Sequence, residues 1–299
     1  MKVLVTGACG FIGYELVKKL DEIGHDVIAF VRENTRPKSS FNVPVVEGDI
    51  RNKKDLERVG RIDCIHHLAA NADPTDFGID MLESNVIGTN NLLQLTAKYN
   101  SKFIFASSSA VYGNLSSPSK EDGDVKPMNA YGNTKLMSEY FCKAYLKEHN
   151  LDVTILRYFN TYGIGEEIKG KDASMIFHFL QSILKTNSVK IYGDGNQQRD
   201  FIYVKDVLNF NIMAMEKNGI PGEVFNVGTG LSTSFNRLVD ILKKQINSDV
   251  KIEYVENPIK NIYQMHTQAD LNKSSKVLGF KPKYTIETAT KEMIDHYNE

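Results

Sequence analysis

The sequence begins with MKVLVTGACGFIG (residues 1–13), an apolar run that leads directly into three spaced glycines. The run is typical of a buried β-strand, and the amphipathic stretch Gly13–Ile23 predicts a helix. Gly7, Gly10 and Gly13 lie where strand gives way to helix. Glycine there lets the chain turn tightly and lets backbone N–H groups approach an anion at the helix N-terminus. The spacing therefore predicts a phosphate-binding turn, with a glycine-rich turn that binds nothing as the alternative.

Short apolar runs alternate with stretches of helical periodicity through the first half of the chain. The runs are nearly continuous in apolar character, which is typical of a parallel sheet covered by helices on both faces. We therefore predict an α/β fold with a doubly wound, Rossmann-type parallel sheet. The predicted strands are Val3–Val5, Val27–Val31, Pro44–Glu47, Cys64–Leu68, Phe103–Ala106 and Val153–Leu156, and the predicted helices are Gly13–Ile23, Met81–Tyr99 and Asn133–Glu148.

This rhythm breaks after about residue 163, where polar, glycine-containing loops separate the remaining elements. We predict helices near Thr233–Ile246 and Thr285–His296 and a strand at Val250–Val255. The chain is long enough for one large domain and a smaller lobe. We therefore predict a Rossmann domain over residues 1–163 and a smaller C-terminal lobe over residues 164–299, with some segments of the second half returning to the Rossmann domain.

The composition is that of an ordinary globular protein, with 299 residues, 41% of them hydrophobic, and a net charge of −1. Such a balance creates no field that attracts nucleic acid or an anionic membrane. No apolar run approaches the roughly 18 residues that span a bilayer. Cys9, Cys64 and Cys142 have neither metal-site spacing nor the number for a disulfide framework. We predict a cytoplasmic protein without a metal ion.

Two further strand ends suit a dinucleotide. Glu47-Gly48-Asp49-Ile50 follows one strand, where Asp49 would reach an adenine, and His67-Leu68-Ala69-Ala70 ends another with small residues that let the backbone approach a ligand. Each could equally be turn chemistry at a strand end. With the glycine-rich turn, they predict a dinucleotide cofactor.

The end of the second strand lacks the acidic residue with which an NAD enzyme usually binds the ribose 2′-hydroxyl. Arg32 stands there instead, followed by Arg36 and Lys38. A cation suits a 2′-phosphate, so we predict NAD or NADP with a slight preference for NADP. In the alternative, Arg32 is solvated or stacks on adenine and Glu33 binds the ribose.

Tyr131-Gly132-Asn133-Thr134-Lys135 places a tyrosine and a lysine on one face of a predicted helix. A phenol with a pKa near 10 is a poor base, but an ammonium about 4 Å away contributes roughly 4 kcal/mol at an effective dielectric of 20. That interaction would lower the phenol pKa by up to about 3 units, toward the range in which a general base works best. Alone, the pattern is also compatible with a structural pair.

The glycine-rich turn, the run SSSAVYG (residues 107–113) and the Tyr–Lys pair together resemble the extended short-chain dehydrogenase/reductase family. The similarity covers nearly the whole chain and includes LRYFNTYG (156–163), YGDGNQQRDF (192–201), ADLNK (269–273) and LGFKP (278–282). These later motifs resemble the nucleotide-sugar epimerase/dehydratase branch, most of all UDP-sugar 4-epimerases. They are specific for the family and much less so for the reaction.

The resemblance implies that Tyr131 is the base and that Lys135 holds the nicotinamide ribose. Ser108 falls on the catalytic hydroxyl, with Ser109 as the alternative. The predicted cofactor-binding residues are Gly7, Gly10, Phe11, Ile12, Gly13, Arg32, Asp49, Ile50, Leu68, Ala69, Ala70, Asn85, Tyr131, Lys135 and Tyr158.

The C-terminal lobe would bind the substrate. Asn160 and Arg199 would contact its diphosphate, because the fork of arginine matches phosphate oxygens. Tyr192 would stack on the nucleobase. In the alternative, Arg199 is a solvated loop residue and Tyr192 packs within the lobe. The full set of predicted substrate-binding residues is Ser108, Asn160, Tyr192, Arg199, Lys260 and Thr267.

The sequence also departs from the family. Ser109 and Ala110 replace the acidic pair that 4,6-dehydratases need, so we do not expect dehydration. Lys260 and then Ile262-Tyr263 stand where similar epimerases show Arg followed by Asp, which leaves the diphosphate and ribose contacts open. Thr267 falls where related epimerases set the width of the sugar pocket, and a small residue there predicts room for an N-acetyl group.

We therefore predict an NAD(P)-dependent nucleotide-sugar epimerase, and favour a UDP-hexose 4-epimerase that works through a transient 4-keto intermediate. An NADP-dependent nucleotide-4-keto-sugar reductase is the first alternative, and a non-enzymatic dinucleotide sensor is the second. Similar enzymes pair the helices that correspond to Met81–Tyr99 and Asn133–Glu148, so we predict a homodimer. From the sequence alone, these apolar faces could equally be internal.

Overall fold

The computed structural model describes residues 1–32, 40–257 and 263–298. The chain forms two compact units, and each is built from several separate segments. Unit 1 comprises Met1–Val111, Asn129–Arg157 and Leu208–Phe225, and unit 2 comprises Tyr112–Met128, Tyr158–Val207 and Asn226–Glu299.

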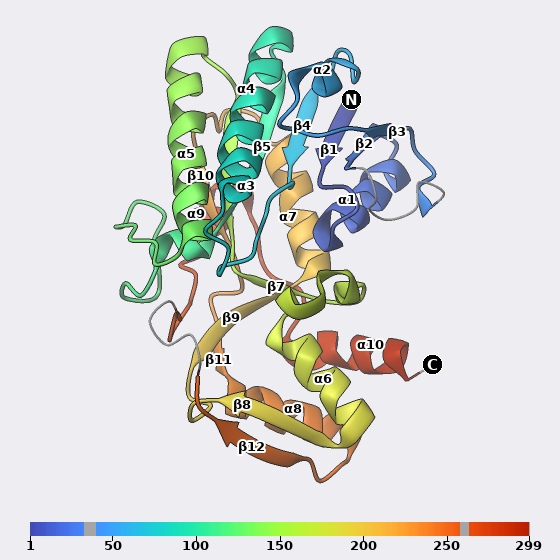
Figure 1. Cartoon of the computed structure of the whole chain (residues 1–299), viewed down its shortest axis with the longest axis vertical. Coiled ribbons are helices and arrows are strands. Elements are labelled where there is room, and N and C mark those ends of the chain that lie inside the picture. Colours follow the sequence, from blue (N-terminus) through green and yellow to red (C-terminus); the bar gives the residue numbers. More distant parts are fainter. Residues whose placement is uncertain (33–39, 258–262, 299) are drawn as a thin grey trace. The chain divides into compact units, whose positions relative to one another are not determined.

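Unit 1 contains a seven-stranded sheet with the order β10-β6-β5-β4-β1-β2-β3 (Figure 1). Its strands are β1 (Lys2–Thr6), β2 (Asp26–Val31), β3 (Val45–Glu47), β4 (Cys64–His67), β5 (Lys102–Ser108), β6 (Val153–Tyr158) and β10 (Val224–Val227). The pairs β1–β2, β1–β4, β2–β3 and β4–β5 are parallel. Strand order reverses at β1, which is where doubly wound sheets bind their ligands. The predicted doubly wound α/β fold is confirmed.

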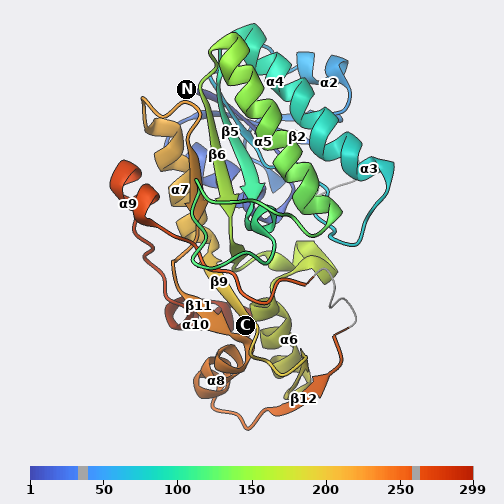
Figure 2. The same ribbon diagram turned by 90° about the vertical axis from the view of Figure 1, so that its left-hand side faces the viewer.

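Helices cover both faces of this sheet. Figures 1 and 2 show α4 and α5 on one face and α1 and α7 on the other. The helices of this region are α1 (Phe11–Glu22), α2 (Lys53–Glu57), α3 (Ile79–Leu82), α4 (Gly88–Tyr99), α5 (Ala130–His149) and α7 (Val204–Glu216). The predicted single helix Met81–Tyr99 is interrupted, because a π-helical turn, η2 (Glu83–Ile87), joins α3 to α4.

The core of unit 1 explains the apolar strands. Leu4, Ile65, Phe103 and Phe105 are fully buried and form one cluster with the inner faces of the helices. Their burial fixes β1, β4 and β5 side by side, so that the residues at the carboxyl ends of these strands come together. Those ends carry the glycine-rich turn, the Leu68–Ala70 segment and Ser108.

Unit 2 contains a three-stranded and a two-stranded sheet. The first is formed by β11 (Ser232–Ser234), β9 (Gln198–Tyr203) and β7 (Asn160–Tyr162), and the second by β12 (Lys251–Val255) and β8 (Ser188–Tyr192). Its helices are α6 (Met175–Thr186), α8 (Phe235–Ile246), α9 (Asn272–Leu278) and α10 (Ile286–Tyr297), with 3-10 turns η3 (Ser109–Tyr112), shared with unit 1, and η4 (Glu166–Asp172). Thus α8, α10 and β12 correspond to the elements predicted there, whereas α6, β8 and β9 were not predicted.

No helix in the described part of the chain combines the length and the apolar character that crossing a bilayer requires.

Candidate active site

The glycine-rich turn between β1 and α1 has room for backbone but not for side chains. Gly7 adopts a φ of +67°, and a Cβ atom on it would lie 2.7 Å from the backbone nitrogen of Ala69. A Cβ atom on Gly13 would lie 2.2 Å from the carbonyl oxygen of Gly7. Gly10 is the N-cap of α1 and supplies no side-chain cap. The first turn of α1 therefore offers its N–H groups to an anion, as a pyrophosphate requires. In that turn Phe11 is buried and Ile12 partly buried.

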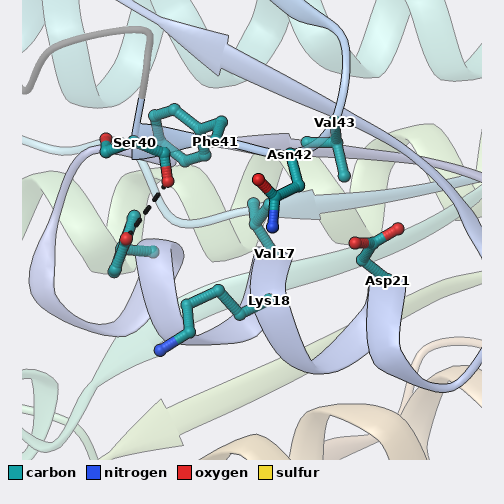
Figure 3. A pocket seen from close by; sticks show the side chains of 8 residues that line it. Val17, Lys18, Asp21, Ser40, Phe41, Asn42 and Val43 are labelled. Atoms are coloured by element: carbon teal, nitrogen blue, oxygen red, sulfur yellow. Dashed lines mark hydrogen bonds between the residues drawn. The ribbon is translucent and has the colours of Figure 1, made fainter.

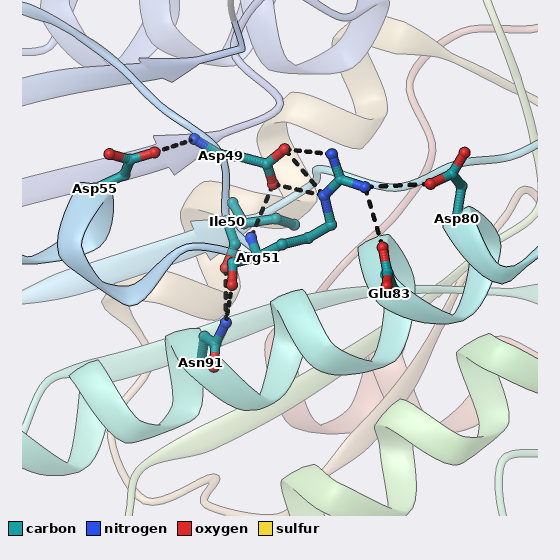
Figure 4. A network of polar contacts seen from close by, with 7 residues as sticks. All are labelled: Asp49, Ile50, Arg51, Asp55, Asp80, Glu83 and Asn91. Carbon is teal, nitrogen blue, oxygen red and sulfur yellow. Dashed lines mark hydrogen bonds and ion pairs between the residues drawn. The ribbon is translucent and has the colours of Figure 1, made fainter.

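Asp49 follows β3 in a network of charges (Figure 4). Its carboxylate accepts from Nε and Nη2 of Arg51 at 2.9 and 2.7 Å. Arg51 Nη1 also lies 3.3 Å from carboxylate oxygens of Asp80 and Glu83. The Arg51 guanidinium is the main reason that the pKa of Asp49 is lowered. The Asp49 carboxylate, which we predicted to contact adenine, therefore stays ionised and is held in place by Arg51. The sequence analysis did not predict Arg51 as a site residue.

The neighbouring backbone is fixed by Asn91 on α4. Its side-chain amide donates to the carbonyl oxygens of Ile50 and Arg51 at 3.0 and 2.9 Å. The Ile50 side chain packs so closely against α4 that a Cβ atom on Gly88 would lie 2.5 Å from it. The segment predicted to contact adenine is therefore rigidly attached to the helix behind it.

Arg32, the predicted ligand of a 2′-phosphate, follows β2 and is exposed. Its charge contributes to the lowered pKa of Asp49, although less than Arg51 does. Glu33, Arg36 and Lys38 lie outside the described residues. The cation predicted at this strand end is present, and the choice between NAD and NADP stays a prediction.

A buried histidine supports the segment Leu68–Ala70. His67 lies between two hydroxyls, with Nδ1 2.8 Å from Thr6 Oγ1 and Nε2 2.9 Å from Thr89 Oγ1. Burial lowers the pKa of His67 well below its ordinary value, so the ring is neutral. The backbone N–H of Ala69 donates to Thr6 Oγ1 at 3.3 Å. This chain of contacts ties the ends of β1 and β4 to α4.

Asn85, predicted to bind the cofactor, is buried in η2 and has its amide fully engaged. Its oxygen accepts from the Asn71 backbone N–H, and its nitrogen donates to the Asn71 carbonyl and to Thr134 Oγ1, each at 2.8 or 2.9 Å. It therefore joins the loop after Ala70 to the helix that carries Tyr131. A direct contact of Asn85 with a cofactor remains a prediction.

Tyr131 and Lys135 lie one turn apart near the start of α5, whose N-cap Asn129 accepts from the Gly132 N–H at 2.8 Å. The side chains of Tyr131 and Ser108, the last residue of β5, are hydrogen-bonded. Ser108 rather than Ser109 therefore makes the contact expected of the catalytic hydroxyl. Its Oγ also accepts from the Ala110 N–H at 3.1 Å.

The expectation that Lys135 lowers the pKa of Tyr131 needs correction. Burial raises the pKa of this phenol, and the hydrogen bond from Ser108 opposes the rise only in part. Lys135 Nζ instead donates to the Ala106 carbonyl at 2.7 Å, and it lies 5.8 Å from the centre of the Tyr131 ring. Because the ammonium is hydrogen-bonded to the end of β5, the protein alone does not lower the pKa of the Tyr131 phenol toward 7.

Lys135 itself is strongly perturbed. It is 3% exposed, and burial lowers its pKa to about 8, against smaller opposing effects from Cys142 and Glu139. Its Nζ also lies 5.0 Å from the centre of the Phe105 ring. A buried, titratable ammonium beside a half-buried phenol is typical of a catalytic site rather than of a structural pair.

A buried ion pair lies next to this site. Glu139, one turn beyond Lys135, accepts from Arg157 Nε and Nη2 at 2.9 and 2.7 Å and from Ser107 Oγ at 2.6 Å. The side chains of Glu139 and Arg157 are 0% and 3% exposed. The pair connects α5 to β6, and Ser107 extends it to β5. None of the three was predicted.

Unit 2 holds a buried cation. Arg199 is 9% exposed, and its Nη1 donates to the Gln198 carbonyl at 2.9 Å. Its guanidinium carbon lies 5.8 Å from the centre of the Phe235 ring and 4.8 Å from that of Tyr263. The alternative in which Arg199 is a solvated loop residue does not fit this burial.

The other predicted substrate residues of unit 2 have different surroundings. Asn160 Nδ2 donates to Thr267 Oγ1 at 3.1 Å, and Thr267 is buried. Tyr192 ends β8 with 42% of its surface exposed, as a stacking platform requires. Tyr158, predicted to bind the cofactor, is the buried last residue of β6. Lys260 lies outside the described residues.

A small pocket between α1 and residues 40–43 lies apart from these residues (Figure 3). Tyr14, Val17, Lys18 and Asp21 line it from the helix, and Tyr14 Oη donates to the Ser40 carbonyl at 3.2 Å. No predicted site residue lines it.

The doubly wound sheet, the glycine-rich turn and the Ser108–Tyr131–Lys135 set give unit 1 the features expected of a dinucleotide-dependent enzyme. The particular class follows from comparison with known families. The model of the NAD dependent epimerase/dehydratase family matches residues 3–228, and the chain belongs to this family.

The relatives support this assignment over the whole chain. A provisionally named UDP-glucose 4-epimerase of Methanocaldococcus jannaschii is 35% identical, with 98% of this chain and 97% of the relative covered. An ADP-L-glycero-D-manno-heptose-6-epimerase of Alkalilimnicola ehrlichii is 32% identical over 90% and 89% of the two chains. The solved structure of UDP-glucose 4-epimerase with UDP-glucose from Thermotoga maritima is 32% identical, with a TM-score of 0.91 and coverage of 100% and 99%.

These findings confirm the predicted family resemblance and the prediction of an enzyme of the NAD-dependent sugar-nucleotide epimerase class. Because relatives of similar identity act on different sugar nucleotides, they do not fix the substrate.

Proposed function

We propose that the protein is a UDP-hexose 4-epimerase that works through a transient 4-keto sugar. The observation that carries the proposal is the hydrogen bond between Ser108 and Tyr131 beside the buried ammonium of Lys135. A phenol with a hydroxyl partner and a buried ammonium suits reversible oxidation of a sugar alcohol. The buried, positively charged Arg199 in unit 2 suits the diphosphate of a nucleotide sugar.

In this proposal each residue moves a proton or holds the substrate. Tyr131 takes the proton of the sugar 4-hydroxyl and later returns it. Ser108 donates to the same sugar oxygen and so polarises it. Lys135 would bind the ribose next to the nicotinamide. Arg199 and Asn160 hold the diphosphate while the 4-keto sugar rotates.

The turn at Gly7–Gly13 and the segments at Asp49 and Leu68–Ala70 would hold the dinucleotide. NAD, when bound, would supply the acceptor and donor of hydride for the sugar carbon, and its positive ring would favour the phenolate. The charge on that ring would offset the raised pKa of Tyr131.

The finer choice of NADP rests on Arg32. A cation at this strand end favours a 2′-phosphate over a bare hydroxyl. Dissociation constants of NAD and NADP for the wild type and for Arg32→Ala test it. We expect the variant to lose affinity for NADP only, and a wild type that strongly prefers NAD would refute the preference.

The reaction is tested by incubating the enzyme with UDP-glucose or UDP-galactose and measuring interconversion. Tyr131→Phe should lose about 10²–10⁴-fold in kcat while it still binds the cofactor, because only the acid–base step is removed. Full turnover by this variant would refute the mechanism. Consumption of NADPH in proportion to product would instead favour the 4-keto-sugar reductase, and turnover of an ADP-heptose alone would refute the UDP-hexose assignment.

Thr267 supports a further choice within this substrate class. Its buried hydroxyl accepts from Asn160, and it is smaller than an aromatic side chain at the same position. We expect turnover of UDP-N-acetylglucosamine beside UDP-galactose, and its loss in Thr267→Tyr. Strict rejection of the acetylated sugar by the wild type would contradict the expectation.

We also propose a homodimer formed through α3, α4 and α5. Large apolar side chains are exposed just before α3, on α3, on η2 where it leads into α4, and on α5, and a monomer seldom exposes so many together. They are Phe77, Ile79, Leu82, Ile87, Met137, Tyr140 and Phe141, with exposures between 39% and 73%.

A cytoplasmic location is a further proposal, which the three buried, free cysteines suit.

A further inference from the structure

The surroundings of Arg199 are unusual for a buried cation. In the part of the chain that the structure describes, no carboxylate forms an ion pair with it, and its hydrogen bond goes to the neutral Gln198 carbonyl. Burying a charge is costly unless a partner compensates. Two aromatic rings, Tyr263 and Phe235, are the neighbours that compensate here.

An aromatic partner differs from a carboxylate in its effect on charge. The face of a ring attracts a guanidinium through its quadrupole, so the cation is held without being neutralised. A carboxylate at the same place would pair with Arg199 and compete with any anionic ligand. The two rings therefore leave the positive charge of Arg199 free to bind an anion.

Tyr263 is the nearer ring, and its backbone is firmly held. Asn114 Nδ2 donates to the Tyr263 carbonyl at 3.2 Å, and Asn114 Oδ1 accepts from the Met265 N–H at 3.1 Å. Gln264 Nε2 donates to the Gly113 carbonyl at 2.8 Å. These three hydrogen bonds attach residues 263–265 to the turn at Gly113–Asn114.

The same segment is in register with the strand that carries Arg199. The Gln198 N–H donates to the Met265 carbonyl at 2.9 Å, and the Thr267 N–H donates to the Gln198 carbonyl at 3.2 Å. These bonds place the chain from Met265 to Thr267 beside β9, one residue from Arg199. These bonds hold the backbone that follows Tyr263 beside Arg199, and the Tyr263 ring lies over the guanidinium from there.

We propose that Tyr263 is a positioning residue for the substrate diphosphate: its ring holds the Arg199 guanidinium in place and leaves its charge free for the phosphates. The inference rests on the proposed function, because it assigns Arg199 to a nucleoside diphosphate. It makes Tyr263 a determinant of phosphate affinity and gives it no part in recognising the base or the sugar.

The test separates phosphate contacts from all others by comparing dissociation constants of UDP and uridine for the holoenzyme, measured by calorimetry. Tyr263→Leu removes the ring, Tyr263→Phe keeps it, and Arg199→Ala removes the charge. Tyr254→Leu is the control, because Tyr254 is an exposed tyrosine of the same unit. ADP, GDP, CDP and dTDP, each with its nucleoside, are measured on the wild type in the same way.

We expect Tyr263→Leu to weaken UDP binding about 5-fold, the size of one cation–π contact, and uridine binding less than twofold. Tyr263→Phe and Tyr254→Leu should keep the wild-type ratio of UDP affinity to uridine affinity. Arg199→Ala should abolish the preference for UDP over uridine. If Arg199→Ala abolishes the ratio and Tyr263→Leu leaves it intact, the inference is wrong and the proposed function stands. Equal weakening of UDP and uridine would show a merely structural role and also overturn it.

The proposed function can fail separately. If another nucleoside diphosphate binds more tightly than UDP, the uracil assignment is wrong, and the same ratio with that nucleotide decides the role of Tyr263. If no diphosphate binds the wild type more tightly than its nucleoside does, both the phosphate role of Arg199 and the inference are refuted.

Discussion

At the residue scale, the candidate site depends on ionisable groups whose surroundings change their chemistry. Lys135 is the clearest case, since burial lowers its pKa to about 8 from an ordinary value of 10.5. Below pH 8 the folded protein therefore holds a buried ammonium. Between about pH 8 and 10.5 the unfolded chain binds more protons than the folded one, so the contribution of Lys135 to stability rises with pH in this window.

Lys135→Met should accordingly stabilise the protein at pH 7 while it abolishes turnover. We expect a gain in the free energy of unfolding of about 1–3 kcal/mol, because each unit of pKa shift corresponds to about 1.4 kcal/mol. The gain should shrink above pH 8 and vanish near pH 10.5. Urea unfolding at several pH values measures it, with the exposed Lys143→Met as a control. A destabilised Lys135→Met variant at pH 7 would contradict the burial argument.

Arg51 offers a second prediction at this scale. Arg51→Met frees Asp49 and leaves it near Asp80 and Glu83, whose like charges repel it. We expect NAD affinity to fall about 10-fold, the value of one charge-assisted hydrogen bond. The affinity for nicotinamide mononucleotide should not change, because that ligand lacks adenine. Calorimetry on this variant and on Arg61→Met, an exposed arginine, measures the difference. Equal losses for both ligands would show that Arg51 acts on the fold and not on the adenine site.

At the scale of elements, the buried pair of Glu139 and Arg157 joins α5 to the sheet. Ser107 adds β5 to the same contact. Because Ser108 is the next residue of β5 and Lys135 lies one turn before Glu139, this contact sets how the strand and the helix of the candidate site meet. A polar contact in an apolar core specifies one arrangement of the elements more strictly than apolar packing does.

Removing one partner of this pair should be costly. Glu139→Gln and Arg157→Met are each expected to lower the free energy of unfolding by about 3–5 kcal/mol, because each leaves a buried group uncompensated. The double variant should lose clearly less than the sum of the two. Urea denaturation measures all three, with the exposed Glu148→Gln as a control. Additive losses would mean that the two side chains stabilise the fold independently.

At the scale of the whole molecule, the proposed function assigns different tasks to the two units. The glycine-rich turn and Ser108, Tyr131 and Lys135 belong to unit 1, and Asn160, Arg199 and Thr267 belong to unit 2. A variant of Asn160 or Arg199 should therefore change the affinity for the nucleotide sugar without changing that for NAD, and a glycine-turn variant should do the reverse.

The proposed dimer also belongs to this scale. Ile79→Lys with Tyr140→Lys places two charges within the exposed apolar surface of α3 and α5. Light scattering should then show a fall from twice the chain mass to the chain mass of 33.7 kDa, with an unchanged circular dichroism spectrum. Leu231→Lys, at an exposed site of unit 2, should leave the dimer intact. A wild type that is already monomeric would refute the proposal.

The sequence by itself determined the strand–turn–helix opening, the parallel sheet and the spacing of Tyr131 and Lys135. Each of these depends on backbone hydrogen bonding and side-chain periodicity over a few neighbouring residues. The order of apolar, polar and glycine residues along the sequence therefore predicts it directly. The π-helical turn around Asn85 escaped the same patterns, since apolar periodicity does not register one extra residue in a turn.

Only the tertiary structure decided the partners of the charged groups. Arg51 with Glu83, Glu139 with Arg157, and Arg199 with Tyr263 meet because the packing of separate elements brings them together. It also reversed the expected direction of the Tyr131 pKa, since desolvation depends on what surrounds a side chain and not on its neighbours in the sequence.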